Sequence, residues 1–162
     1  MKHVLAIIVL CLIGSVACAQ GKLPVHLKVT TPEGTTVQMG DIIKGDLPVV
    51  ITFWATWCKP CLSELESLKD IQNEWQGKVR IIAIAMDDSK TSAKVKALVS
   101  GKKWPFEIYQ DINQEFFQAM NFTSIPFAVV VNSEGAITYQ HSGYSPGSES
   151  ALIDAALKIL KK

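Results

Sequence analysis

The sequence has no excess of charge of either sign. Its 162 residues include 16 lysines and arginines and 15 aspartates and glutamates, so no strong positive field exists to attract nucleic acid or an anionic membrane surface. With 10 glycines and 7 prolines it also lacks a collagen-like or low-complexity composition. We therefore expect no nucleic-acid partner, and the 48% of apolar residues favours one compact domain with a buried core.

A hydrophobic run long enough for a transmembrane helix is missing from the N-terminal region. Residues 4–19 form an apolar stretch of 16 residues, whereas a spanning helix needs about 20. The stretch ends in small residues, which is typical of a secretory signal peptide. We expect a signal peptide at residues 1–19, cleaved after Ala19, and hence a periplasmic or other extracytoplasmic protein. The alternatives are an uncleaved N-terminal anchor and lipidation at Cys18, for which Ser15 is a weak match to the usual residue three positions earlier.

Cysteine is scarce. The chain has four, and Cys11 and Cys18 fall in the segment that we expect to be removed. Only two residues separate the remaining Cys58 and Cys61, so a bridge between them would close too short a loop to remove much chain entropy. The pair does not provide a stabilising disulfide framework, so we interpret the two cysteines as reactive residues.

Hydrophobic periodicity predicts an α/β protein. Alternating patterns at 25–29 and 35–39, with a turn signal between them, predict an N-terminal β-hairpin. The β-branched and aromatic run at 48–54 predicts a central strand that is buried on both faces. One amphipathic helix is expected from Pro60 to Gly77. Its apolar residues recur at intervals of three and four: Leu62, Leu65, Leu68, Ile71 and Trp75.

The remaining elements continue the alternation of strands with helices. Gly101 is expected to end the helix at residues 89–100. Strands alternating with helices, followed by a hairpin and a last helix, favour a mixed central β-sheet with helices on both faces, in a single domain at residues 20–162. The further strands are expected at 79–86, 106–109, 127–131 and 136–141, and the further helices at 89–100, 112–120 and 148–160.

The motif Trp57-Cys58-Lys59-Pro60-Cys61 lies where the buried strand ends and the first long helix begins. Cys58 should therefore lie at a helix N-terminus, where unpaired backbone N–H groups and the helix dipole favour the thiolate over the thiol. Cys61, one helical turn further, shares the face of Cys58 and should be more buried. We predict that Cys58 is the attacking cysteine and that Cys61 resolves the mixed disulfide.

Two other interpretations of the cysteine pair are weaker. A structural zinc site needs four ligands, and beside the pair the mature chain offers only His26 and His141, without a second C-x-x-C or an H-x3-H spacing. Two thiols that merely pack as small apolar residues are more common in cytosolic proteins. We expect no metal or organic cofactor, and we assign no role to His26 or His141.

The segment FWATWCKPC, the leucine-rich helix after it and Ser124-Ile125-Pro126 before a strand resemble the thioredoxin superfamily, and more closely its exported TlpA/ResA-like branch. The resemblance extends over nearly the whole mature chain. It implies a thioredoxin-like fold and a redox-active Cys58–Cys61 disulfide. It also implies a cis Ile125-Pro126 bond that faces the cysteines, with the Ile125 backbone binding an extended substrate segment.

The resemblance suggests further binding residues beside the cysteines. Trp57 would line the partner-binding surface, whereas Trp54 could equally belong to the core. Lys59 and Pro60 lie between the two cysteines. Lys59 would favour the thiolate form of Cys58; the alternative is an ordinary solvated lysine at a helix start.

Two positions depart from thioredoxin itself. Thioredoxin carries a buried aspartate six residues before its first active-site cysteine, and Thr52 occupies that position here. In the ResA-like branch a glutamate three residues after the second cysteine takes a comparable place, and Glu64 matches it. Glu64 lies about 60° around the helix from Cys61, inside the apolar stripe. Burial would favour its protonated form and suit it to proton exchange with a thiol; the alternative is an exposed first-turn glutamate that interacts with the helix dipole.

The resemblance implies an exported protein-disulfide oxidoreductase. We expect it to act as a monomer that reduces protein disulfides, supplied with electrons by a membrane-bound dithiol donor, with cytochrome c maturation as one such role. The alternatives are a general disulfide oxidase or isomerase, a thiol peroxidase, or a copper-delivery module. A peroxidase would carry threonine where this chain has Ala55, and copper delivery would favour C-x-x-x-C over the spacing found here.

Overall fold

The computed structural model describes residues 21–161. The expected signal peptide at residues 1–19, and with it the question of cleavage, anchoring or lipidation, lies outside the described residues. Among the helices of residues 21–161, none combines the length and the apolar character needed to cross a membrane.

A seven-stranded mixed sheet runs through the molecule in the order β2-β1-β5-β4-β3-β6-β7. β3 pairs in parallel with β4, and β4 with β5, whereas the β3–β6, β6–β7, β1–β2 and β1–β5 pairs are antiparallel. The predicted mixed sheet and N-terminal hairpin are therefore confirmed. The strands are β1 (Lys28–Thr30), β2 (Thr36–Gln38), β3 (Val49–Trp54), β4 (Arg80–Ala85), β5 (Glu107–Gln110), β6 (Phe127–Val131) and β7 (Ile137–Ser142).

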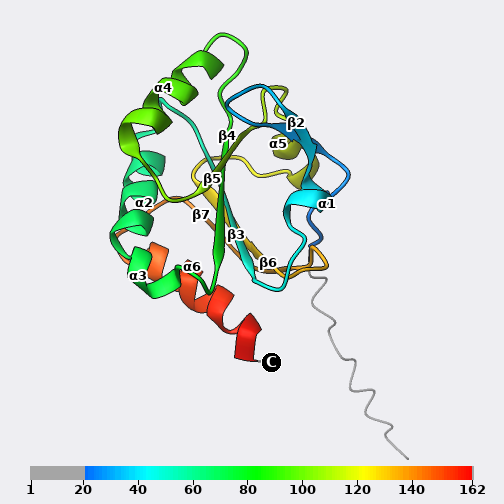
Figure 1. The fold of residues 1–162 in the computed structure, drawn as a ribbon, viewed down its shortest axis with the longest axis vertical. Helices are drawn as coiled ribbons and strands as arrows, with labels where there is room; N and C mark the ends of the chain where they lie inside the picture. Colours follow the sequence, from blue (N-terminus) through cyan, green and yellow to red (C-terminus); the bar gives the residue numbers. More distant parts are fainter. Residues whose placement is uncertain (1–20, 162) are drawn as a thin grey trace, which may run out of the picture.

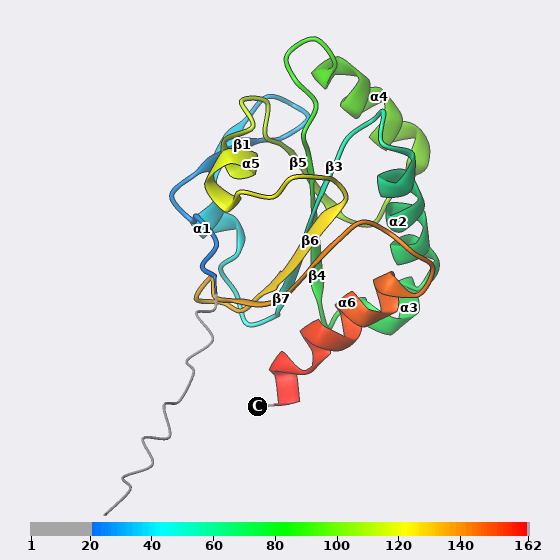
Figure 2. The same cartoon turned by 180° about the vertical axis from the view of Figure 1, so that it is seen from behind.

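Helices cover both faces of this sheet, as predicted. α2, α3, α4 and α6 lie on one side, and α1 and α5 lie on the other (Figures 1 and 2). The side chains of the sheet divide in the same way, because the strand period of two sends alternate residues to opposite faces. The helices are α1 (Met39–Ile42), α2 (Lys59–Asp70), α3 (Gln72–Trp75), α4 (Ser92–Lys102), α5 (Glu115–Met120) and α6 (Ser148–Leu157), followed by the 3₁₀ turn η1 (Ile159–Lys161).

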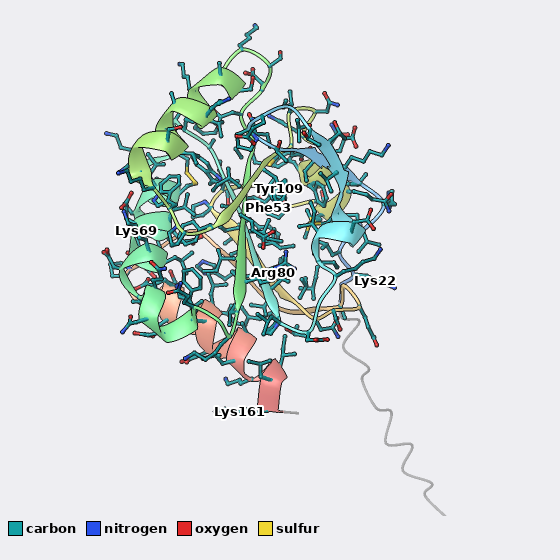
Figure 3. The ribbon with its side chains drawn as sticks, in the orientation of Figure 1. Lys22, Phe53, Lys69, Arg80, Tyr109 and Lys161 are labelled. Atoms are coloured by element: carbon teal, nitrogen blue, oxygen red, sulfur yellow. A yellow bond between two sulfur atoms is a disulfide. The ribbon has the colours of Figure 1, made fainter. Side chains whose placement is uncertain are left out.

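The central strand β3 is buried at all six positions. Phe53 points to the α1 and α5 side, where its ring packs 4.9 Å from that of Phe122 and 5.9 Å from that of Phe116, measured between centroids. Figure 3 shows Phe53 near the centre of the molecule. Trp54 points to the opposite side and meets Trp104 edge-on at 5.3 Å. Packing on both faces and pairing on both edges fix the end of β3, where the cysteine motif begins.

The predicted helix from Pro60 to Gly77 is divided in two. α2 ends at Asp70, and the backbone leaves helical geometry at Ile71 (φ −94°, ψ 22°) before α3 begins. The indole N–H of Trp75 donates to the carbonyl oxygen of Leu68 at 2.7 Å. This bond satisfies one of the carbonyls that a helix end leaves without a backbone partner. The apolar periodicity continues through the break because Trp75 still packs into the same core.

The helix expected at 89–100 is displaced toward the C-terminus. A carboxylate oxygen of Asp88 accepts hydrogen bonds from the backbone N–H groups of Lys90 and Thr91, both at 3.0 Å, which holds the segment in a turn before α4. The expectation that Gly101 stops the helix is wrong. α4 continues through it, and Lys103 ends the helix with a left-handed backbone at φ 50°.

α5 begins at Glu115, later than expected, because a buried carboxylate binds its first turn. The two oxygens of Asp111 accept from the N–H groups of Glu115 (3.0 Å) and Phe116 (2.9 Å). Asp111 is only 2% exposed. Burial raises the pKa of Asp111, and the bonds to Phe116 and Glu115 offset only part of that effect.

The raised pKa of Asp111 predicts a pH-dependent stability. The folded protein binds this proton more tightly than the unfolded chain, so the contribution of Asp111 to stability is fully present below the unfolded pKa of about 3.9 and is lost as pH rises through the higher folded value. Urea unfolding across this pH range should show that D111N gains stability relative to wild type as pH rises. D46N, at an exposed site before β3, is the control and should show no such trend. A difference between D111N and wild type that is constant with pH would contradict the assignment.

Candidate active site

Cys58 and Cys61 form a disulfide at the start of α2, with an S–S distance of 2.01 Å and a Cα–Cα distance of 5.3 Å. Figure 3 draws disulfide bonds in yellow. Cys58 is the N-cap residue of the helix, and its Sγ accepts a hydrogen bond from the backbone N–H of Cys61 at 3.3 Å. Cys58 is 6% exposed and Cys61 is fully buried. The sulfur at the helix N-terminus is thus the one that a second molecule can reach, and a negative charge on it would be stabilised there.

The loop between β3 and α2 is fixed by a buried carboxylate from the neighbouring strand. Asp87 follows β4 and is fully buried. Its two oxygens accept from the backbone N–H of Thr56 at 2.9 Å and from the Thr56 hydroxyl at 2.6 Å. β3 and β4 run in parallel and pair Trp54 with Ala85, so both chains leave the sheet at the same edge. The sequence analysis gave Asp87 no role, although its position directly after a buried strand was visible.

The Ile125-Pro126 bond is cis, as the resemblance implies. β6 begins at the next residue and runs antiparallel to β3, pairing Phe127 with Phe53. This pairing brings the loop to the cysteines, and the Ile125 carbonyl oxygen lies 3.8 Å from the Sγ of Cys58. Because the sulfur of a disulfide carries no hydrogen, the two atoms are in van der Waals contact and do not form a hydrogen bond. The loop therefore borders the reactive sulfur.

A hollow of about 370 Å³ adjoins the cysteine motif, since its lining includes Trp57, which precedes Cys58, and Ile125, whose carbonyl oxygen contacts the Cys58 sulfur. Trp57 is 65% exposed. The lining is mainly apolar, which suits an apolar side chain of an extended segment. The full lining comprises Trp57, Met86, Gln114, Phe117, Thr123, Ser124 and Ile125.

Three other residues of the FWATWCKPC segment do not line this hollow. Lys59 and Pro60 are exposed on the first turn of α2 and do not line it. Trp54 is fully buried against Trp104, so it belongs to the core and not to a partner-binding surface.

Glu64 is fully buried, which excludes the alternative of an exposed first-turn glutamate. The Thr52 hydroxyl donates to one of its carboxylate oxygens at 2.7 Å, and the Nε2 of His141 lies 3.3 Å from the other. Thr52, at the position of the thioredoxin aspartate, is therefore a partner of the carboxylate. The contact with His141, which lies 77 positions from Glu64 in the chain, was not predictable from any local pattern.

The sheet together with the disulfide at a helix N-terminus and the adjoining cis-proline loop defines a thioredoxin-like fold with a redox-type cysteine pair. The chain belongs to the Redoxin family, whose model matches residues 19–157. The expected superfamily and fold class are thus confirmed.

Relatives and solved structures agree with this assignment. The chain is 31% identical over 99 residues to the thioredoxin-like protein YneN of Bacillus subtilis, covering 59% of this chain and 56% of that protein. It is 29% identical over 124 residues to the thiol-disulfide oxidoreductase ResA of Bacillus anthracis, covering 76% and 69%. The chain therefore spans 56% of the length of YneN and 69% of the length of ResA. A thioredoxin-like protein structure from Porphyromonas gingivalis matches with a TM-score of 0.73 at 37% identity, covering 84% of this chain and 90% of that one.

The contact between Asp87 and Thr56 predicts a loss of both stability and cysteine reactivity when it is broken. D87A leaves the backbone N–H of Thr56 without its acceptor. The loss should lower the free energy of unfolding by about 1–3 kcal/mol. T56V leaves one oxygen of the fully buried Asp87 carboxylate without its hydroxyl donor and should also cost about 1–3 kcal/mol. Urea unfolding of the reduced proteins measures both values.

The same variants test whether the loop orients Cys58. Alkylation of Cys58 in reduced D87A should be slower than in wild type, because the segment that carries the cysteine is less fixed. D88A is the matched control, since Asp88 holds only the turn before α4; its alkylation rate should equal that of wild type. Equal rates in D87A and wild type would mean that Asp87 does not orient Cys58.

Proposed function

We propose that this protein is an exported thiol-disulfide oxidoreductase that exchanges disulfides with other proteins through Cys58 and Cys61. The observation that carries the proposal is the pair itself: an accessible sulfur at a helix N-terminus, bonded to a fully buried one and bordered by an apolar hollow. Membership of the Redoxin family supports it. The two sulfurs store both electrons of the exchange, so the reaction calls for no metal or organic cofactor.

The reductive reaction would proceed in two displacements. The Cys58 thiolate attacks a substrate disulfide, forms a mixed disulfide and releases one substrate thiolate. Cys61 then loses its proton and attacks the Sγ of Cys58, which closes the Cys58–Cys61 bond and releases the second substrate thiolate. The substrate thiolates take up protons from water. Two electrons pass from the protein to the substrate.

Glu64 is proposed as the base that takes the proton of Cys61. Side chains three residues apart on a helix are neighbours, with about 5–6 Å between their Cβ atoms. Both groups are fully buried, so water cannot readily remove the thiol proton. A carboxylate held by Thr52 and His141 at this distance provides an acceptor inside the protein.

Substrate binding is proposed for the surface around Cys58. Trp57 and Ile125 border the hollow and would hold an extended segment, with the backbone of Ile125 binding the substrate chain and Pro126 shaping the loop. Lys59 and Pro60 are exposed beside the cysteine. They would contact the rim of the substrate, and the charge of Lys59 would favour the Cys58 thiolate.

The direction of exchange is proposed to be reductive. Removal of residues 1–19 would release the domain outside the cytoplasm, where oxidising conditions prevail, and a membrane-bound dithiol donor would re-reduce the pair. The resemblance to ResA-like proteins supports this direction. Apocytochrome c, whose C-x-x-C-H cysteines carry the haem, is the substrate class suggested by that resemblance.

Trapping of the mixed disulfide tests the roles of the two cysteines. Reduced C61S should accumulate a covalent complex with a disulfide-containing protein such as insulin, because no second thiol remains to release the substrate. C58S should form no such complex, since its buried Cys61 cannot reach a partner. Non-reducing gel electrophoresis detects the complex, and wild type should catalyse insulin reduction with no accumulation. If C58S formed the complex as readily as C61S, the assignment of Cys58 as the attacking cysteine would be contradicted.

The reduction potential tests the direction. Equilibration with dithiol buffers should give a value near the −270 mV or so of thioredoxin, which fits a reductant. A value near about −120 mV would make the protein an oxidant and contradict the reductive proposal, while leaving the exchange chemistry intact.

A further inference from the structure

Glu64 lies in a buried polar site, and one of its partners, His141, is partly exposed to solvent. Each carboxylate oxygen has one partner within the described residues: the Thr52 hydroxyl at 2.7 Å and the His141 Nε2 at 3.3 Å. Thr52 is fully buried. The side chain of His141 is 17% exposed while that of Glu64 is 0% exposed. The imidazole thus touches the buried carboxylate on one side and water on the other.

The register of the sheet explains how these groups meet. Thr52 on β3 is paired with Ala128 on β6, and Ala128 is paired with His141 on β7. The three residues form one row across the sheet, with neighbouring strands about 4.8 Å apart. The small side chain of Ala128 leaves space between the two polar ones. Glu64 descends from α2 into this space and bonds to both neighbours.

Within the part of the chain that the structure describes, the lysines on or beside α2 and α6 are engaged elsewhere or exposed: Lys69 donates to the Lys102 carbonyl oxygen, and Lys59 and Lys158 are exposed. Cys61 shares α2 with Glu64, Tyr139 is two residues from His141 on β7, and the hydroxyl of Tyr144 lies 2.7 Å from the Ser67 hydroxyl on α2. The acidic groups of α6, which packs on β6 and β7, are engaged elsewhere or exposed: Glu149 accepts from the Gly147 N–H, and Asp154 is exposed.

A buried carboxylate that gains and loses a proton changes the charge of its surroundings. An unpaired charge in a protein interior is costly, and the cost favours the neutral carboxyl group. A second group that releases a proton to water whenever the carboxylate gains one would hold the total charge constant. His141 has the position for this exchange, because its Nε2 lies 3.3 Å from the carboxylate while its side chain is partly exposed. Histidine is the side chain suited to exchanging protons with water near neutral pH.

We propose that His141 is a positioning residue for the resolving step, whose imidazole exchanges a proton with water as Glu64 exchanges one with Cys61. The inference rests on the proposed function, in which Glu64 takes the Cys61 proton. With ionised Glu64 and protonated His141, the thiol proton moves to Glu64 and the imidazole releases a proton to water. Cys61 becomes the thiolate that attacks Cys58. When the disulfide is reduced again, Cys61 recovers its proton from Glu64 and His141 takes one from water.

A single-turnover assay separates the two cysteines. Reduced protein is mixed with one equivalent of an aromatic disulfide that releases a coloured thiolate. The first release reports the attack of Cys58 on the reagent, and the second reports the attack of Cys61 on the resulting mixed disulfide. Both rates are measured from about pH 6 to about pH 9, around the thiol pKa range.

H141Q keeps a hydrogen-bond donor for Glu64 but cannot take up a proton. The second release should be about tenfold slower than in wild type near neutral pH. The deficit should shrink as pH rises, because the higher hydroxide concentration then offers another acceptor for the Cys61 proton. The first release should be unchanged. E64Q removes the base itself and should slow the second release by about 100-fold.

H26Q is the matched control, because His26 is exposed near the hairpin and has no place in the proposed chemistry. It should reproduce both phases of wild type. H141A with added imidazole provides an independent variant: the added base should restore the second release. If H141Q does not fold, this rescue still decides the question.

Two results would overturn the inference: an H141Q profile equal to that of wild type, or a deficit of the same size at every pH, which marks a purely structural effect. Failure of imidazole to accelerate the second release of H141A would count against it as well. Failure of the proposed function looks different, since wild type itself would then show no second release.

Discussion

The junction between β3 and α2 is the constraint on which the rest of the site depends. β3 is buried at every position and paired on both edges, with β4 on one side and β6 on the other. Its end is therefore fixed relative to the sheet, and the helix that follows starts with Cys58 as its N-cap. The backbone N–H of Cys61 in the first turn donates to the sulfur, which favours its charged form.

The neighbouring strands bring the remaining parts of the site to that junction. β4 runs parallel to β3, so Asp87 emerges beside the motif and binds Thr56. β6 runs antiparallel, so its first residues follow the Ile125-Pro126 loop that borders Cys58. The two directions of pairing have different consequences: the parallel strand supplies a group that anchors the loop, and the antiparallel strand supplies a wall for the hollow.

The buried polar site around Glu64 contrasts with the apolar packing around it. Its neighbours on this side of the sheet include Ala128 and Val130, together with Leu65 and Leu68 of α2. Replacing a buried polar network with apolar residues is often neutral or favourable for stability, whereas removing one partner alone is costly. A carboxylate retained in such a place, one turn after a buried cysteine, is therefore better explained by chemistry than by stability.

Much of the local structure could be predicted from the sequence, because strand burial, helix periodicity and the helix start at Pro60 depend on neighbours in the chain. The C-x-x-C motif and the placement of Glu64 on the apolar face of its helix were predictable for the same reason. The break at Ile71 and the start of α4 at Ser92 were not, since the Trp75 indole and the Asp88 turn compete with continued helix through contacts that propensity does not encode. Asp87 and His141 reach the site from positions 31 and 77 residues away from their partners. Only the pairing of β3 with β4, and of β6 with β7, decides those contacts, because strand register is set by the packing of the whole sheet.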